Sequence, residues 1–310
     1  NHVLAQHAIL RTAFAGLDGG RLAQVVLRDV VVPCRREDWR GQDEAAQSQA
    51  WQELMARDRA VGFDFATAPL LRLHLVRIAQ DRHKFLLSYH HALLDGWSIP
   101  LLLGELFDAY ERATSGQPLQ ATASRPYRDY MQWLRRQPVD SAADYWRTHL
   151  AGIEEPTRLH GVAPVAPPIQ PDFGVLRRQL PQPLFRRLDA LVRREGLTLN
   201  IVTQAAWALV LGLHAARNDV VFGITTSGRP VDLDGAEGMI GLFINTVPAR
   251  VRLASGDSVL DLLRTMHAEQ VRRDEHSHLP LPEIQALSGV RGDTPLFGSL
   301  VVFENYPVGG

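Results

Sequence analysis

The chain is poor in several residue types and patterns, and each shortage excludes a class of structure. Its only cysteine is Cys34, so no disulfide can form within the chain, and a reducing, cytoplasmic compartment is expected. No run of 18 apolar residues occurs, so no membrane-spanning helix is predicted. The formal net charge is −1, so the chain has no general attraction to nucleic acid or to an anionic membrane.

What is present is typical of a globular protein. The 310 residues are 45% hydrophobic and 22% charged, enough for one large domain or two smaller ones. Four prolines within 160–174 argue against a helix and predict a stiff, extended linker at 161–174. The linker would separate a lobe at 1–160 from a second lobe at 175–310. Because the chain starts without Met and ends just after a strand-like run, we expect both ends to continue in a longer protein.

The spacing of apolar residues predicts the main elements. Helical spacing predicts helices at 43–60, 99–111, 125–136, 141–150, 182–195, 199–215 and 258–273. Alternating or β-rich runs predict strands at 23–32, 70–78, 175–180, 220–225, 239–251 and 296–306. A further strand begins at Phe85 and leads to His90 and His91. It forms a hairpin with 70–78, because only a short turn separates the two runs.

One short stretch of the chain combines several chemically active residues. His90 and His91 follow the second strand of this hairpin, and Asp95-Gly96 comes shortly afterwards as a predicted turn. A helix then begins, with Ser98 predicted as its N-cap. Reactive side chains at the end of a strand, over a turn, are well placed to face a cleft.

The two histidines suggest proton transfer. An imidazole titrates near neutral pH, so it can take a proton from an amine, hydroxyl or thiol that attacks an acyl group. Asp95 could hold the ring's second nitrogen, or it could be a salt-bridge partner that fixes the loop. Purely structural histidines are the alternative. No metal site is predicted, because adjacent strand residues point to opposite faces and the H-x-H pair of His276 and His278 has no nearby cysteine.

Several segments resemble one protein family. Residues 90–98 read H-H-A-L-L-D-G-W-S, which resembles the H-H-x-x-x-D-G signature of nonribosomal peptide synthetase condensation domains, in the superfamily of chloramphenicol acetyltransferase. Residues 7–14, 127–133 and 240–250 resemble further motifs of these domains, and 278–282 matches a later one loosely. Gln6 stands where the family's R-H-x-x-L-R-T-x-F motif has its first arginine, and Arg11 in that motif is interpreted as structural. The resemblance covers essentially the whole chain.

This resemblance implies a fold and a set of site residues. The fold is α/β (α+β), with two chloramphenicol-acetyltransferase-like lobes, mixed sheets flanked by helices, and an active-site tunnel between the lobes. The C-terminal lobe would be incomplete. By motif position, His91 is the catalytic residue, His90 is structural, and Gly96 keeps the site open. The residues expected in the tunnel wall are Trp97, Ser98, Asn245 and Thr246.

The resemblance also implies a reaction. An acceptor aminoacyl thioester would attack a donor aminoacyl or peptidyl thioester with its α-amine and form a peptide bond. Both substrates would be carried on phosphopantetheine arms of donor and acceptor peptidyl carrier domains, and an adenylation domain would be adjacent. The domain itself would bind no cofactor and no metal, and neither nucleic acid nor a membrane would be a partner.

Three alternatives share the same fold. A noncatalytic recruitment domain is disfavoured by the intact histidine motif. An epimerisation domain would need an additional glutamate motif that the sequence lacks. An acyl-CoA-dependent acyltransferase of the plant type would carry D-F-G-W-G, whereas Asp172-Phe173-Gly174 is followed by Val175 and lies in the predicted linker.

The motif aspartate is predicted to be paired. Asp95 lies in a turn beside the site, and a buried carboxylate needs a partner. In the resembled family an arginine at the position of Arg229 pairs with it. We therefore predict a salt bridge between the lobes, bidentate in geometry, that holds the loop so that His91 faces the tunnel. Asp95 would not orient His91 directly.

Overall fold

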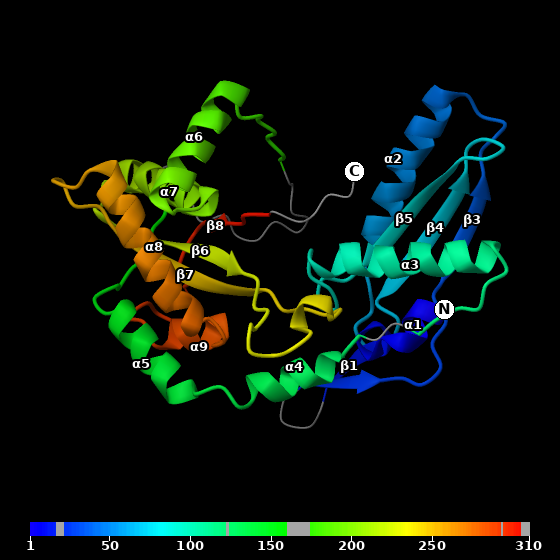
Figure 1. The fold of residues 1–310 in the computed structure, drawn as a ribbon, viewed down its shortest axis with the longest axis horizontal. Coiled ribbons are helices and arrows are strands. Elements are labelled where there is room, and N and C mark those ends of the chain that lie inside the picture. The colour runs from blue at the N-terminus through cyan, green and yellow to red at the C-terminus, as the bar shows by residue number, and fades with distance from the viewer. Residues whose placement is uncertain (17–21, 122–123, 160–173, 293, 305–310) are drawn as a thin grey trace. The chain divides into compact units, whose positions relative to one another are not determined.

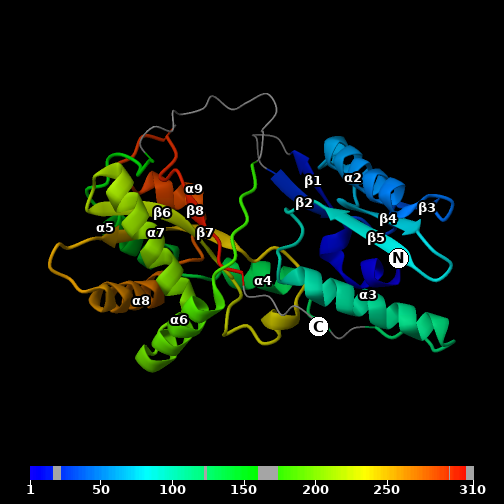
Figure 2. The same cartoon turned by 90° about the horizontal axis from the view of Figure 1, so that it is seen from above.

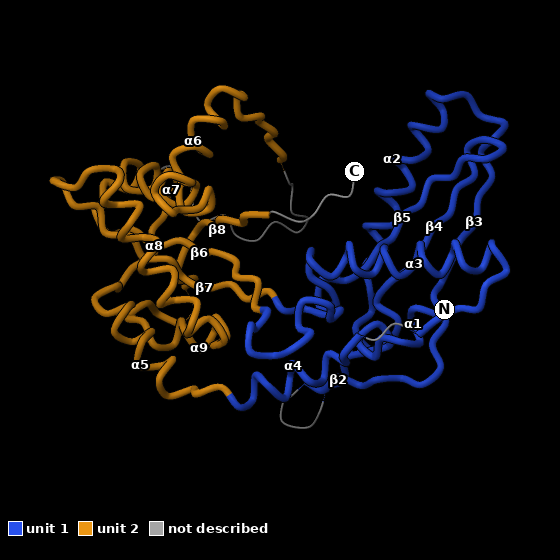
Figure 3. The backbone as a smooth tube through the Cα atoms, in the orientation of Figure 1, with its two compact units in different colours: residues 1–136, 229–243, 306–310 blue, residues 137–228, 244–305 orange. Residues whose placement is uncertain are grey.

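A computed structural model describes residues 1–310 apart from 17–21, 122–123, 160–173, 293 and 305–310. The described chain forms two compact units (Figure 3). Unit 1 contains Asn1–Arg136 together with Arg229–Phe243, and unit 2 contains Gln137–Gly228 and Ile244–Asn305. A short segment from the second half of the sequence therefore folds with the first half.

Unit 1 contains two small sheets and several helices. Its elements are α1 (His2–Gln6), the 3-10 helix η1 (Ala8–Arg11), β1 (Thr12–Gly16), β2 (Leu22–Val26), β3 (Cys34–Asp38), α2 (Glu44–Val61), β4 (Leu71–Arg77), β5 (His83–Tyr89), α3 (Ser98–Thr114), α4 (Tyr127–Leu134) and the 3-10 helix η2 (Ala236–Gly238). β1 and β2 pair antiparallel. In the second sheet, β4 pairs parallel with β3 and antiparallel with β5.

The sheet of β3, β4 and β5 lies between α2 and α3 (Figures 1 and 2). Alternation along the strands explains this arrangement, because successive side chains point to opposite faces. Val76 and Leu86 pack with Leu54 of α2. Leu71 and other residues of the opposite parity pack with α3. The Asp43 side chain accepts a hydrogen bond from the Ala46 N–H and so begins α2 where the sequence predicts.

Unit 2 is built around a second three-stranded sheet. Its elements are α5 (Val139–His149), α6 (Gln182–Glu195), α7 (Leu199–Ala215), β6 (Asp219–Thr226), β7 (Asn245–Arg252), α8 (Val259–Glu275), α9 (Leu281–Ala286) and β8 (Leu300–Val301). β6 is central, antiparallel to β7 and parallel to β8. Every residue from Val220 to Ile224 is buried, so side chains cover both faces of β6.

The units differ from the predicted lobes in two places. The first lobe was predicted to end at 160, but α5 belongs to unit 2, because Trp146 is fully buried in that unit's core. Arg250 also donates to the His149 and Ala151 carbonyls and so fastens the end of α5 to β7. The second difference is 229–243, which was assigned to the second lobe and folds in unit 1. The predicted linker at 161–174 lies outside the described residues apart from Gly174.

Most predicted helices are confirmed, and most errors concern strands. Residues 175–180 form no strand, and Val175 and Leu176 are largely exposed without a strand partner among the described residues. β7 begins only at Asn245, because the preceding residues leave the sheet of unit 2 and join unit 1. The predicted strand at 296–306 is reduced to β8. β3 was missed, because its sequence C-R-R-E-D is mostly charged and its residues are largely exposed.

No single described helix is long and apolar enough to cross a membrane. Only α6 and α7 pass that test together, on length and composition, and they are bent by 110° relative to each other. Several residues of α7 are buried in the core of unit 2.

Candidate active site

The histidine motif lies in a turn that begins where β5 ends. β4 and β5 pair in register up to Leu71 and Tyr89. His90 is the next residue, and its N–H donates to the Leu70 carbonyl at 2.9 Å. Its Nδ1 atom accepts the Ala92 N–H at 3.0 Å, and its carbonyl accepts the Leu93 N–H at 3.0 Å. His90 therefore closes the turn in which His91 lies.

The two histidines lie in different surroundings. The His90 ring is half-buried and packs edge-on against two phenylalanines: its centroid is 4.4 Å from that of Phe65 and 6.3 Å from that of Phe63. His91 is exposed, and its ring centroid lies 6.5 Å from that of Tyr89. The packing of Phe63 and Phe65 on His90 was not predicted, although the two aromatic residues of F-D-F are a signal that this loop packs against another element.

Asp95 is fully buried, and its carboxylate joins two distant segments. Oδ1 accepts hydrogen bonds from the Ser98 N–H at 2.8 Å and the Ser98 hydroxyl at 2.7 Å. Oδ2 accepts the Phe243 N–H at 3.1 Å, and the Asp95 N–H donates to the Gly241 carbonyl at 3.2 Å. None of these described bonds involves His91. Asp95 therefore holds residues 241–243 against the start of α3.

Arg229 pairs with Asp95 as predicted, but the predicted bidentate geometry is wrong. Its Nη2 atom lies 3.4 Å from Asp95 Oδ1, so the ion pair is present but makes a single long hydrogen bond instead of a bidentate pair. The second terminal nitrogen, Nη1, donates instead to the Ala236 and Met239 carbonyls at 2.6 and 2.9 Å. The guanidinium also lies 4.1 Å from the Phe243 ring centroid. Because 229–243 belongs to unit 1, the pair lies within one unit and does not join two lobes.

The ion pair of Arg229 and Asp95 is buried away from solvent. Its side chain is 8% exposed and that of Asp95 is 0% exposed. Burial lowers the pKa of the Arg229 guanidinium from its ordinary value, and the Asp95 charge opposes this effect. Removing either charge would leave the other without its opposite charge inside the protein.

Ser98 has a role that the sequence did not reveal. It was predicted as the N-cap of the following helix and as part of a tunnel wall. It is instead the first residue of α3 and is fully buried. Its hydroxyl lies 2.7 Å from the Gly241 carbonyl, and it accepts the Gly241 N–H and Arg229 Nη2 at 3.1 Å each. Ser98 therefore connects the motif turn with the segment of Arg229 and Gly241.

Gly241 is required by a close approach. A Cβ atom at this position would lie 2.1 Å from the Tyr127 ring, well inside contact distance. The Tyr127 hydroxyl donates to the Leu242 carbonyl. Burial raises the pKa of Tyr127, so its hydroxyl stays protonated and remains a donor. Burial likewise raises the pKa of the neighbouring Tyr130 to about 12. The 127–133 motif thus contributes packing that holds the 240–243 segment.

The remaining predicted site residues are placed as follows. Gly96 and Trp97 are half-buried in the turn before α3. Asn245 lies in unit 2, where its side-chain amide donates to the Ser277 and Leu279 carbonyls at 2.7 and 2.8 Å. Its amide therefore fastens the chain after α8 to β7, a structural role. A wall role for Trp97, Asn245 and the half-buried Thr246 stays a prediction.

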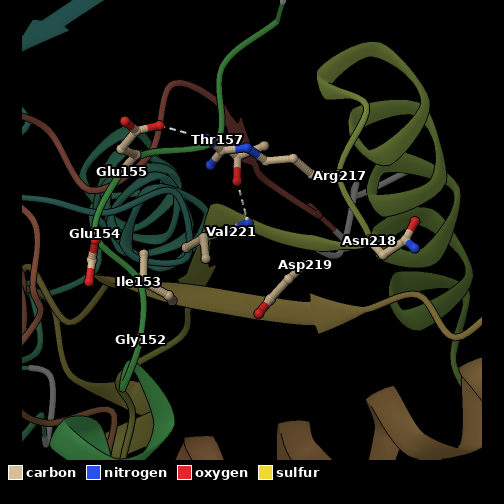
Figure 4. A pocket seen from close by; sticks show the side chains of 9 residues that line it. All are labelled: Gly152, Ile153, Glu154, Glu155, Thr157, Arg217, Asn218, Asp219 and Val221. Atoms are coloured by element: carbon tan, nitrogen blue, oxygen red, sulfur yellow. Dashed lines mark hydrogen bonds and ion pairs between the residues drawn. The ribbon is translucent and has the colours of Figure 1, made fainter.

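A pocket of about 470 Å³ lies in unit 2 (Figure 4). Its lining includes Glu155, Thr157, Arg217 and Asp219. Arg217 pairs with Glu155 at 2.6 Å, and Thr157 accepts the Val221 N–H at 2.8 Å. None of the predicted site residues lines it. Among the described residues, no group of three His, Cys, Asp or Glu side chains is arranged to hold a metal ion.

Comparisons with known proteins agree on one family. The family model described as "Condensation domain" matches residues 1–309. Linear gramicidin synthase subunits D and C of Brevibacillus parabrevis are 40% and 38% identical over 98% and 99% of this chain, which spans only 6% and 4% of their lengths. The solved first condensation domain of the calcium-dependent antibiotic synthetase, in complex with a substrate analogue, has a TM-score of 0.77 and 22% identity, covering 98% of this chain and 70% of that one. The chain therefore belongs to the condensation domain family of the nonribosomal peptide synthetases.

Proposed function

We propose that this domain joins two carrier-bound substrates by forming a peptide bond, with His91 as the residue that accepts the proton. The observation that carries the proposal is the exposed His91 imidazole on a turn that is fixed from both sides. His90 closes the turn at its start, and Asp95 fastens it at its end. Membership of the condensation domain family supports the same reaction.

The reaction is an aminolysis of a thioester. The α-amine of the acceptor attacks the carbonyl carbon of the donor, a C–N bond forms, and the C–S bond breaks. The amine proton passes to His91 and then to the leaving thiolate. A free α-amine has a pKa of about 8, so roughly a tenth is neutral at pH 7, and deprotonating it beforehand gains only about tenfold. The larger contributions are the positioning of two tethered reactants and removal of the proton as the bond forms.

The partners follow from this chemistry. The two substrates are thioesters on phosphopantetheine arms, delivered by a donor and an acceptor peptidyl carrier domain. An adenylation domain adjacent to this one supplies the activated amino acid. The arms belong to the carriers, so the domain itself holds no cofactor.

Single-turnover condensation in the intact synthetase tests the role of His91. With both carriers loaded, His91→Ala should slow formation of the dipeptidyl thioester by about 10²- to 10⁴-fold, the usual contribution of a general base. His83→Ala is the matched control, because His83 is exposed at the opposite end of β5. Normal turnover by His91→Ala would overturn the role. Inversion of the donor without bond formation would show an epimerase instead.

A further inference from the structure

A cluster of hydrogen-bonded polar side chains joins α2 to the hairpin of β4 and β5. It is not part of the site described above, but its contacts continue as far as the turn that carries His91. Asp58, on α2, is 9% exposed. It accepts hydrogen bonds from Arg72 Nε at 2.5 Å, His74 Nε2 at 3.1 Å and the Ser88 hydroxyl at 2.5 Å. Arg72 and His74 lie on β4 and Ser88 lies on β5, so one carboxylate ties α2 to both strands of the hairpin.

Arg72 then fastens the loop that follows α2. Its Nη1 atom donates to the Gly62 carbonyl at 2.6 Å, and its Nη2 atom donates to the Asp58 carbonyl at 2.5 Å. Its guanidinium also lies 4.2 Å from the Phe63 ring centroid. All three guanidinium nitrogens are therefore used, and a lysine could not reproduce this set of bonds.

The loop fixed in this way presents its two aromatic rings to the motif. Phe63 and Phe65 are the rings that pack against His90. Phe65 is further held by Phe14, whose N–H donates to the Phe65 carbonyl at 2.7 Å. His90 in turn accepts the Ala92 N–H through Nδ1, so the neutral ring carries its proton on Nε2. The sequence of contacts thus runs from Asp58 through Arg72 and the two rings to the turn that holds His91.

We propose that Arg72, held by Asp58, is a positioning residue for His91, acting through Phe63, Phe65 and His90. This inference rests on the proposed function of His91. A rigid supporting shell matters because a displacement of about 1 Å at a reacting group can cost about 10²-fold in rate. The contacts of the Arg72 guanidinium are with Asp58, Gly62 and Phe63, so its effect on His91 is indirect, and we expect it to alter the chemical step and leave carrier binding unchanged.

Two variants in the intact synthetase test the proposal. Arg72→Met removes the fastening of the loop, and Phe65→Leu leaves Arg72 and Asp58 in place but removes the ring nearest to His90. Both should lower kcat for dipeptidyl-thioester formation about ten- to a hundredfold, with KM for the loaded carriers within about twofold of wild type. Arg72→Lys should not restore the rate. The matched control for Arg72→Met is Arg77→Met, because the Arg77 guanidinium also donates to backbone carbonyls, those of residues 79 and 80. The matched control for Phe65→Leu is Phe85→Leu, because the Phe85 ring is exposed on β5.

A second measurement separates positioning from general loss of structure. Nitrogen NMR of histidine-labelled protein should show His90 as a single Nε2–H tautomer in wild type and in Phe85→Leu, and as a mixture in Phe65→Leu. The proposal is overturned if Phe65→Leu has the wild-type kcat. It is also overturned if KM rises as much as kcat falls in both variants. If His91→Ala is itself fully active, the proposed function fails instead, so the two failures are distinguishable.

Discussion

One buried ionisable group in each unit shows how differently burial can affect charge. In unit 1, burial opposes ionisation of Asp58, but hydrogen bonds from Arg72 and Ser88 and the charge of Arg72 bring its pKa down to about 2. In unit 2, burial lowers the pKa of His149 to about 4, and nearby positive charges add to the effect. These charges belong to Arg273, Arg250, Arg252 and Arg272. Asp58 therefore stays charged because it is paired, whereas His149 stays neutral because it is buried and the nearest charges around it include four arginines.

Arg273 shows the same contrast with Arg229. Both guanidiniums are buried, and burial lowers both pKa values. Arg229 has the Asp95 carboxylate beside it. Arg273 is 3% exposed, and its Nε and Nη2 atoms have no hydrogen-bond partner in the part of the chain that the structure describes. The comparison teaches that burial alone does not reveal whether a charge is held by a partner.

The largest expected effect comes from breaking a paired charge. Arg229→Met leaves the Asp95 carboxylate buried without its opposite charge, which should lower the free energy of unfolding of unit 1 by about 3 kcal/mol. The value is at the lower end for such pairs because Ser98 and Phe243 still donate to Asp95. Urea-dependent hydrogen exchange of the α3 amides measures it. The double variant with Asp95→Asn should recover part of the loss; a double variant as unstable as the sum of the singles would contradict the pairing.

An intermediate effect is expected from the pH dependence of unit 2. The pKa of His149 is about 4 in the folded protein against an ordinary value of 6.5, so the unfolded chain binds a proton first as pH falls. Stability is therefore fully present above pH 6.5 and is lost progressively towards pH 4, by about 2 kcal/mol between pH 7 and pH 5. The Glu269 carboxylate lies 3.9 Å from His149 Nδ1 and opposes this shift, but burial and the four arginine charges outweigh it.

The control for this pH effect is His149→Gln. Hydrogen exchange of the α8 amides, compared between wild type and variant at pH 5 and pH 7, isolates the contribution of the one histidine. The variant should lose about 2 kcal/mol less than wild type over this range. The same slope in both proteins would show that His149 titrates normally.

The smallest effect is expected where the charge is unpaired. Arg273→Met removes a buried guanidinium whose Nε and Nη2 atoms make no hydrogen bond among the described residues and which interacts with Asp274 and Glu269 only through charge, so unit 2 should stay within about 1 kcal/mol of wild type. The same substitution at Arg229 is the direct comparison. Because the Arg273 charge helps to lower the pKa of His149, that pKa should also rise towards its ordinary value, which NMR titration would show. A loss as large as that of Arg229→Met would mean that Arg273 has an ionic partner.

Local signals predicted much of the fold. The helix predicted at 43–60 is confirmed with Asp43 as its cap, and the helices predicted at 182–195 and 199–215 are confirmed as α6 and α7. All three depend on the spacing of side chains along the helix, and α2 and α7 also have side-chain caps within a few residues. The strands at 175–180 and 239–244 were wrong, because a β-rich run becomes a strand only where a partner strand is available.

The site was predicted less completely than the helices. The order of His90, His91 and Asp95 identified the turn, and the family motif identified Arg229 as the partner of Asp95. The single hydrogen bond between them, the buried position of Ser98 and the packing of Phe63 and Phe65 on His90 were not predicted. Each depends on residues that lie far apart in the sequence and carry no shared local pattern.

The sequence by itself determined the elements whose causes are local: the capped helices, the hairpin of β4 and β5, and the turn that carries His91. Only the tertiary structure decided that 229–243 folds with the first half, that Ser98 joins this segment to the motif, and that Asp58 keeps its charge while His149 loses its proton. The physical reason is that desolvation and charge pairing depend on which distant groups lie within a few ångströms. Spacing along the chain does not contain that information.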